Sequence, residues 1–477
     1  MASKMLSLFR GYSIFITGLL YIGTALTGVG NWHGALTVAT LLIIVQCIPV
    51  TTGITRFVSY GLFFLGSALL LFSGADKPTW FQAVIQNGKV FTLLVFVPLM
   101  GIPLRFPKYR LALENALKKT ITGSRDGLYL LSHGVSHLLG SVINIACLSI
   151  TYHILTIGTG GKHRHMLAKA AMRGYGVTLL WSPNSAAVGV VLAYWDHQLT
   201  DIIPYGIPLV LLTLVVGWLE NRAKYYIYGK KLAGDNVKKN DDELPDKHIG
   251  EACRCSAGSG ADQGKYLCQL VLGITSMLAI VIVADILTSI SILTLVPLVA
   301  LIFPFLWATI TGDVKDYILE LKKYLTEAIP RMSNEATIFI GAGFFAVAVG
   351  VSPLGHYLPL LYKSIAGNAT LVVLLTGTII IGLSMVGCHP MLTTTSILTA
   401  LTPQALGLSF PFMAMAILGS FGLAVTCSPF SAGNLNVAAL VGKESTEVSF
   451  KWQITYSLVM FLVLIGYLNV LKWCCGI

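Results

Sequence analysis

Two short polar segments with a central proline recur in the two halves of the 477-residue chain. Residues 182–186 and 428–432 both read Ser-Pro-x-Ser-Ala, and each interrupts an apolar stretch long enough to cross a bilayer. Proline removes a backbone donor and clashes with the preceding turn, so a helix breaks at such a segment. Broken backbone at membrane depth is tolerated only where protein buries it or where it lines a water-filled cavity. Two broken helices at corresponding places in two halves therefore indicate the binding site of a transporter.

These segments offer oxygen ligands and helix ends. The half-helix that follows each break presents free N–H groups and the positive end of its dipole, which suits an anionic group. Carbonyl oxygens freed by each break, together with serine and asparagine side chains, are suited to bind Na⁺. Neither segment contains an acidic residue, which argues against proton coupling through a buried carboxylate. The predicted ion-binding residues are Ser182, Pro183, Asn184, Ser185, Ser428, Pro429, Ser431 and Asn434.

Two other apolar segments, 127–155 and 369–401, have polar residues near their centres. Basic residues flank 127–155 on both sides, so a full crossing would place one basic cluster outside, against the positive-inside rule. We therefore predict a re-entrant hairpin that enters and leaves on the cytoplasmic side, with its tip near 131–137. Segment 369–401 is too long for one crossing and predicts a second hairpin, which enters from outside and has its tip at 383–390.

The two predicted hairpin tips share a pattern. Ser132 and His137 in the first stand at the same spacing as Ser384 and His389 in the second. Ionisable groups at membrane depth are functional candidates, whereas small polar groups can bond either to a substrate or to a neighbouring helix. The predicted substrate-binding residues are Ser132, His133, Ser136, His137, Asn144, Ser384, His389, Thr393 and Thr394.

The histidines allow more than one interpretation. They can contact a substrate or a proton, since imidazole titrates near neutral pH, or they can be hydrogen-bonded packing residues. A different hypothesis is an integral membrane enzyme built on His133, His137, His163 and His165. The last two lie in a basic loop that lacks carboxylates and the ligand spacing of a metal site. We therefore expect a protein that is not an enzyme, with no cofactor or metal other than Na⁺ as a coupling ion.

The composition places these segments in a membrane protein. Hydrophobic residues make up 55% of the chain and charged residues 11%, and the mean hydropathy is +0.76, which excludes a soluble globular protein. Apolar runs near the ~20 residues that span hydrocarbon recur along almost the whole length. The net charge of +11 comes from basic loops, a pattern typical of cytoplasmic segments rather than of a nucleic-acid surface.

The hydropathy pattern predicts an all-α polytopic fold with about 11 transmembrane helices and two re-entrant hairpins. The N-terminus is expected in the cytoplasm and the C-terminus outside. This topology leaves few of the 32 Lys and Arg residues outside, namely Lys77, Lys89, Lys363 and Lys472. The predicted spans are 11–29, 33–50, 56–74, 88–104, 173–195, 204–221, 266–284, 287–310, 335–354, 409–440 and 452–471.

Each half of the chain then has the same order of elements, with one hairpin before its last two spans. Because each half has an odd number of spans, the second half is inverted relative to the first. The predicted units are an N-terminal helix (1–32), a first repeat (33–228), a cytoplasmic linker (229–265) and a second repeat (266–477).

With two hairpins and two broken helices in an inverted repeat, the chain resembles the ion transporter superfamily, which includes the divalent-anion/sodium symporters and the citrate carriers. In the symporters, Ser-Asn-Thr motifs occupy the hairpin tips and a Thr-Pro-Pro-Asn-type loop breaks the following helix. Here Ser182-Pro183-Asn184 and Ser428-Pro429-Phe430 stand at the breaks, whereas the predicted tips carry serine and histidine.

The resemblance implies a secondary active transporter that moves a small organic anion, a carboxylate, coupled to Na⁺. It also implies an elevator mechanism, in which a rigid transport domain slides past a scaffold domain that often dimerises. The expected protein is thus a homodimer in the inner membrane of a bacterium. The alternative is a proton-coupled carrier, or an exporter of another anion, that uses the hairpin histidines.

Overall fold

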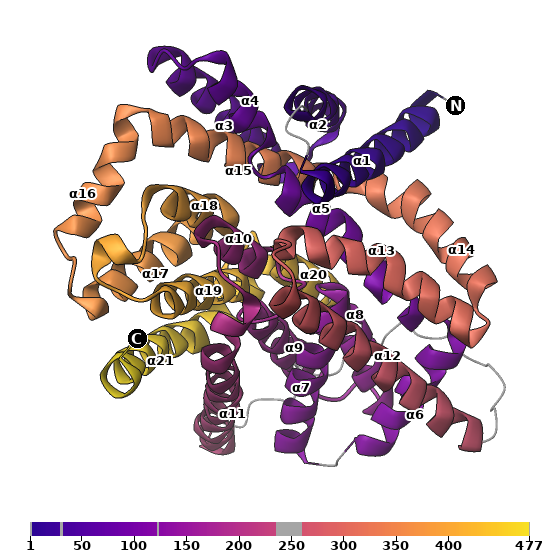
Figure 1. Ribbon diagram of the computed structural model, residues 1–477. Helices are drawn as coiled ribbons and strands as arrows, with labels where there is room; N and C mark the ends of the chain where they lie inside the picture. Colours follow the sequence, from indigo (N-terminus) through magenta and orange to yellow (C-terminus); the bar gives the residue numbers. More distant parts are fainter. Residues whose placement is uncertain (1, 29–31, 122–123, 235–259, 477) are drawn as a thin grey trace.

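The computed structural model describes residues 2–28, 32–121, 124–234 and 260–476. Every regular element in these ranges is helical, in agreement with the predicted all-α fold (Figure 1). Most of the predicted linker at 229–265 lies outside the described residues.

The helices follow one another with short connections. Those of the first half are α1 (Ala2–Thr27), α2 (His33–Cys47), α3 (Gly53–Phe72), α4 (Lys77–Ile85), α5 (Gly88–Phe96), α6 (Pro107–Thr120), α7 (Arg125–Ile143), α8 (Ala146–Gly158), α9 (Arg164–Thr178), α10 (Ala186–Trp195) and α11 (Ile203–Gly234). Those of the second half are α12 (Gly260–Leu287), α13 (Ile292–Thr311), α14 (Val314–Lys323), α15 (Ser333–Val351), α16 (Tyr357–Lys363), α17 (Ala369–Met385), α18 (Pro390–Ala400), α19 (Phe410–Cys427), α20 (Ala432–Val441) and α21 (Ile454–Cys475). Two π-helical segments, Tyr324–Ala328 and Glu447–Gln453, precede α15 and α21.

Ten helical segments within the described ranges are long and apolar enough to cross a membrane. They correspond to the predicted spans with one exception, 173–195, which is divided between α9 and α10. Helix α9 begins at Arg164. The hydropathy pattern predicted a start near 173, because the first turns of α9 carry basic residues that are typical of a loop. One of them, Arg173, is fully buried. The chain is a multi-pass membrane protein.

The two hairpins and the two broken helices lie together in the middle of the molecule (Figure 1). Helices α1–α5 lie along one side of this group, and α12–α16 continue around it. Contacts between the halves are reciprocal: α8 packs against α20, and α18 packs against α10. Each hairpin therefore supports the broken helix of the other half as well as its own.

The first hairpin has its tip at a different place from the prediction. The turn lies at Asn144–Ile145, between α7 and α8, and Asn144 has a positive φ of 53° with ψ −140°. The stretch 131–137 lies within α7, so the predicted tip was wrong. Its polar residues are there because α9 packs closely on α7, and Ser132 Oγ donates to Leu167 O of α9 at 2.7 Å. A polar side chain in a membrane helix can thus mark a helix contact as well as a turn.

The second hairpin turns at 386–389, within the predicted stretch 383–390. Gly387 has φ 99°, and Pro390 begins α18 at its first turn. Proline is favoured at a helix start because its missing N–H would have no partner there. The second tip was easier to locate because glycine and proline mark it.

The two broken helices cross at a pair of glycines. A Cβ on Gly422 would lie 2.8 Å from Gly176 O, and a Cβ on Gly176 would overlap Thr426 Oγ1. Gly176 stands as far before Ser182 as Gly422 stands before Ser428. Small residues let helix backbones approach one another in membranes. The crossing of α9 and α19 therefore depends on the absence of a side chain at both positions.

We expect Gly422→Ala to lower the free energy of unfolding by about 1–3 kcal/mol, because the added methyl group must separate two packed backbones. Denaturant unfolding of the purified protein in micelles measures this change. Gly466→Ala on α21 is the matched control, since a Cβ there meets nothing within 4 Å. Equal unfolding midpoints for Gly422→Ala and Gly466→Ala would contradict the tight crossing.

Candidate functional site

The first break is built around the Ser182 hydroxyl. Ser182 Oγ donates to Ser141 O in the last turn of α7 at 3.0 Å, and it accepts from Asn184 N at 3.3 Å. Ser185 then caps α10, its Oγ accepting from Val188 N at 3.5 Å. The non-helical segment is thereby tied to the end of the hairpin on one side and to the start of the second half-helix on the other.

The second break repeats this arrangement. Ser428 Oγ donates to Ser384 O in the last turn of α17 at 2.7 Å and accepts from Phe430 N at 3.2 Å. Ser431 caps α20, its Oγ accepting from Asn434 N at 3.1 Å. The four serines predicted to bind an ion thus use their hydroxyls to hold the breaks in shape.

The structure corrects the alignment of the two hairpins. Ser141, not Ser132, is the counterpart of Ser384, because both accept from the first serine of a break. The positive-φ residues then also correspond, since Asn144 follows Ser141 at the same spacing as Gly387 follows Ser384. The predicted pairing rested on a shared serine and histidine within α7 and was wrong.

Free oxygen ligands are present at both breaks, and they belong to asparagine. Asn184 Nδ2 donates to Ser141 O at 2.7 Å, and Asn434 Nδ2 donates to Thr426 O and Ser428 O, both at 2.8 Å. The Oδ1 atoms of Asn184 and Asn434 have no hydrogen-bond partner among the described residues. The two residues are only 2% and 0% exposed. A buried carbonyl oxygen without a partner is costly, so each is a candidate cation ligand.

Among the described residues, three buried threonine hydroxyls share this property, those of Thr151, Thr156 and Thr394, and two of them correspond in the two halves. Thr151 on α8 and Thr394 on α18 are both 0% exposed, and neither Oγ1 has a partner in the described part of the chain. They stand at the same spacing after Ser141 and Ser384. Thr394 was predicted, whereas Thr151 was missed because the hairpins were aligned on Ser132. An alignment on the correct serine would have identified it.

The predicted residues of the first hairpin fall into two groups. Asn144 lies at the tip, where its Oδ1 accepts from Ile145 N and from the Tyr175 hydroxyl, both at 2.8 Å. Ser132, His133, Ser136 and His137 lie back along α7, away from the tip. These four residues were predicted to bind substrate because the tip of the hairpin was predicted too early in the chain.

Packing explains most of the side chains that lie back along α7. Ser136 Oγ lies 3.4 Å from Cys147 Sγ of α8, and the His137 ring lies 5.9 Å from the Trp181 ring, centroid to centroid. His133 differs, because both of its ring nitrogens lack a partner among the described residues although the residue is 2% exposed. Of the two histidines on α7, only His133 has both ring nitrogens without a hydrogen-bond partner among the described residues.

The predicted residues of the second hairpin lie at its tip and along α18. His389 caps α18, its Nδ1 accepting from Met391 N at 3.1 Å, and its ring packs edge-on against Phe339 of α15. Thr393 Oγ1 donates to Pro390 O of its own helix at 3.3 Å. These two side chains already have partners, in contrast to Thr394.

Tyr175 connects the two halves, and the sequence analysis did not identify it. Its hydroxyl donates to Asn144 Oδ1 at the first hairpin tip. Its ring edge lies 3.6 Å from where a Cβ on Gly433 would be, at the start of the second half-helix. The tyrosine precedes Gly176, the crossing residue, and links the first hairpin tip to the start of the second half-helix of the second break. A tyrosine in an apolar helix gives no sequence signal of such a position.

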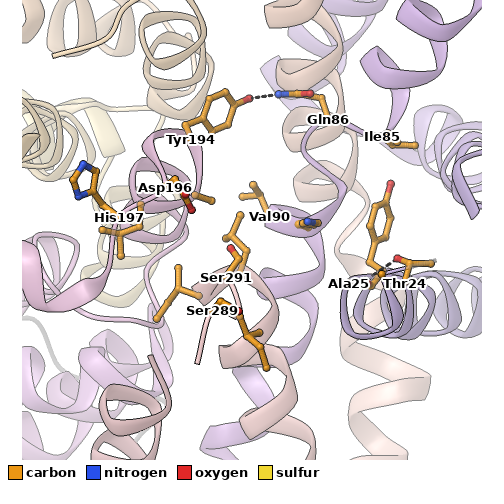
Figure 2. A pocket seen from close by; sticks show the side chains of 18 of the residues that line it. Thr24, Ala25, Ile85, Gln86, Val90, Tyr194, Asp196, His197, Ser289 and Ser291 are labelled. Atoms are coloured by element: carbon orange, nitrogen blue, oxygen red, sulfur yellow. Dashed lines mark hydrogen bonds between the residues drawn. The ribbon is translucent and has the colours of Figure 1, made fainter. Parts of the chain in front are cut away.

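A cavity of about 1080 Å³ lies elsewhere, between the end of α10 and the helices α1, α5 and α13 (Figure 2). None of the predicted ion-binding or substrate-binding residues lines it. The unpartnered polar groups at the breaks and this cavity thus lie in different parts of the molecule.

Comparison with known proteins gives a fold. No family model matches the chain, and no curated protein matches it. Among solved structures, the YdaH transporter of Alcanivorax borkumensis superposes with a TM-score of 0.55 at 15% sequence identity. The match covers 87% of this chain and 98% of that chain. The chain has the fold of a membrane transporter. At this identity the likeness establishes the fold alone, and the resemblance to the ion transporter superfamily stays a hypothesis.

Proposed function

We propose that the protein is a secondary active transporter that couples the movement of a small organic carboxylate to Na⁺. The transporter fold and the multi-pass architecture support the general class. The observation that supports the site is the pair of helix breaks, each held by the same hydrogen bonds to the end of a hairpin.

Na⁺ is the proposed coupling ion because each break offers a buried oxygen ligand with no other use. The Oδ1 atoms of Asn184 and Asn434, with freed backbone carbonyls nearby, form a neutral set of hard oxygen donors. The hydroxyls of Thr151 and Thr394 add candidates of the same kind. A neutral donor set suits a monovalent cation that must both bind and leave within a transport cycle.

A carboxylate is the proposed substrate group because α10 and α20 begin at the breaks. Each half-helix starts with N–H groups that its capping serine satisfies only in part, and the dipole adds positive potential at the same end. Tyr175 lies beside the start of α20 and bonds to Asn144, so these two residues can set the orientation of the substrate. Bound cations would further favour an anionic group there.

The proposed mechanism is of the elevator type, with the two hairpins and broken helices as the transport domain. The reciprocal packing of α8 on α20 and of α18 on α10 supports a single rigid body with two-fold character. The repeats at 33–228 and 266–477, the cytoplasmic N-terminus and a homodimer in a bacterial inner membrane belong to this proposal. The basic loops support the orientation of the N-terminus.

Proton coupling is the second candidate, and His133 favours it. An imidazole that is almost fully buried, with neither nitrogen bonded to a described residue, is a candidate proton carrier. Under this alternative the carrier would need a proton gradient and would lose activity in His133→Gln.

Purified protein in liposomes distinguishes these mechanisms. We expect an inward Na⁺ gradient to drive accumulation of a carboxylate identified by a thermal-shift screen. A proton gradient with equal Na⁺ on both sides should give little accumulation, because the breaks carry no titratable group. Full accumulation under the proton gradient alone would indicate that H⁺, not Na⁺, is the coupling ion, with His133 as the candidate proton carrier. Chemical turnover without any gradient would contradict a carrier altogether.

A further inference from the structure

The cavity of about 1080 Å³ has two walls of different origin (Figure 2). One wall comes from many elements: the ends of α1, α4 and α12, and the starts of α2, α5 and α13. The other wall comes from one continuous segment, 192–201, which is the end of α10 and the loop after it. In the predicted topology all these helix ends lie on the non-cytoplasmic side.

Segment 192–201 is fastened to the second hairpin and to α19. Trp195 Nε1 donates to Leu401 O at the end of α18 at 3.1 Å. The His197 ring stacks on Phe410 of α19, with centroids 3.5 Å apart and planes inclined by 7°. The segment also continues directly from the first break through α10. It therefore belongs to the same body as the hairpins and broken helices.

Three hydrogen bonds join this segment to the opposite wall. Gln86 Nε2 donates to the Tyr194 hydroxyl at 2.8 Å, a contact visible across the top of Figure 2. On the other side, Leu199 N donates to Asp285 Oδ2 at 2.8 Å, and Gln198 Nε2 donates to Asp285 O at 3.0 Å. The Asp285 side chain thus acts as a cap for the short helix that begins at Leu199. The bonds lie at two sites, one on each side of the cavity.

Helix α10 also packs against α5 and α13, and these hydrogen bonds are the polar part of that contact. A hydrogen bond of this kind shifts a conformational equilibrium by about 2- to 10-fold. Bonds of such strength can hold one arrangement while still allowing another to be populated. The tight ring stacking of His197 on Phe410, in contrast, keeps the segment with α19.

We propose that this cavity is the outer mouth of the transport pathway and that segment 192–201 is its movable wall. The bonds to Gln86 and Asp285 hold the wall in the observed position and break when the transport domain moves toward the cytoplasm, which widens the mouth. This inference rests on the proposed function, because it requires a transport domain that moves. Its test needs neither substrate nor gradient, so it can fail while transport is confirmed.

The experiment measures the width of the mouth by pulsed electron paramagnetic resonance in lipid nanodiscs. Spin labels at Trp32→Cys and Ala193→Cys stand on opposite walls, and both positions are exposed. Every other cysteine except the buried Cys47, Cys147 and Cys427 is changed to serine: Cys253, Cys255, Cys268, Cys388, Cys474 and Cys475. We expect one dominant separation in this background and a second, longer separation when Tyr194→Phe and Asp285→Ala are added. The longer population should rise about 2- to 10-fold for each bond removed.

Two further variants make the result specific. Asp285→Asn keeps an oxygen that can accept from Leu199 N, so it should change the distances less than Asp285→Ala. Tyr324→Phe removes a buried hydroxyl that donates to Val95 O at 2.6 Å, away from the cavity, and should change nothing. A distance distribution that stays the same in the Tyr194→Phe/Asp285→Ala protein would overturn the proposal and make the segment a fixed wall.

Discussion

Na⁺ should stabilise the protein much less once Asn434 is replaced by alanine. In the wild type a bound ion stabilises the folded state by RT ln(1 + [Na⁺]/Kd), so the unfolding midpoint should rise with NaCl and not with choline chloride. Asn434→Ala removes an oxygen ligand that has no other partner among the described residues. We expect the apparent affinity for Na⁺ to fall at least about tenfold, which corresponds to about 1.4 kcal/mol.

The same substitution also removes two structural hydrogen bonds, from Nδ2 to Thr426 O and Ser428 O. This loss lowers the stability at all salt concentrations, by about 1–3 kcal/mol, because buried carbonyls are left without a donor. The two effects separate in the measurement, since only the loss of the ligand changes the slope against Na⁺. Asn184→Ala should behave in the same way at the first break.

Asn436→Ala is the matched control for Asn434→Ala. Asn436 lies on the same half-helix, and its Oδ1 already accepts from Ser149 Oγ at 3.3 Å. We expect a modest loss of stability with an unchanged response to Na⁺. If the unfolding midpoints of Asn184→Ala and Asn434→Ala both rose with NaCl as in the wild type, the breaks would not bind Na⁺. This would hold even if transport measurements established Na⁺ coupling.

The helix breaks could be predicted from the sequence because their cause is local. Pro183 and Pro429 interrupt the helices by their own covalent structure, whatever packs around them. The capping role of Ser185 and Ser431 is local for the same reason, since each side chain bonds to an amide three residues ahead. The second hairpin turn, marked by Gly387 and Pro390, belongs to the same class of signal.

The first hairpin turn was misplaced because its cause is not local. Asn144 adopts a positive φ without glycine or proline beside it, and the Tyr175 hydroxyl supports its side chain from another helix. Polar residues such as Ser132 were interpreted as a tip, although they mark the contact between α7 and α9. A single sequence does not distinguish a polar residue at a turn from one at a helix interface.

The partners of the breaks depend entirely on tertiary structure. Ser182 and Ser428 each bond to a carbonyl of a residue on another helix, and no pattern along the chain indicates which one. The crossing of α9 and α19 at Gly176 is equally invisible, because the chain contains 47 glycines. The sequence therefore predicted where the two helices break but not the contacts that hold the breaks.

The largest loss of stability is expected from Arg173→Met. The Arg173 guanidinium is fully buried on α9 and donates to Gln453 Oε1 at 2.9 Å, to the Tyr129 hydroxyl at 3.2 Å and to carbonyls of two further residues. It forms an ion pair with Glu220 Oε2 at 3.1 Å and lies 4.2 Å above the Tyr456 ring. One side chain thus joins α9 to α7, α11 and α21.

Methionine has a similar length but no donor, so Arg173→Met leaves these acceptors without their donor and leaves Glu220 paired with Lys224 but not with a guanidinium. Breaking a buried ion pair by removing one member costs about 3–5 kcal/mol. We expect the unfolding midpoint in micelles to fall accordingly, and limited proteolysis to cut first near α9 or the π-helical segment before α21. Arg173→Lys should be intermediate, since an ammonium cannot reach partners on both sides of the planar guanidinium.

Arg222→Met is the control for this substitution. Arg222 forms an ion pair with Asp126 at 3.7 Å, but the two side chains are 45% and 39% exposed. A solvated pair of this kind contributes up to about 1 kcal/mol, so the variant should unfold close to the wild type. If Arg173→Met also unfolded like the wild type, the guanidinium network would not be what fixes the first broken helix. The geometry of the first break would then have to be held by the glycine crossing and by the bonds of Ser182 and Asn184 to Ser141 O.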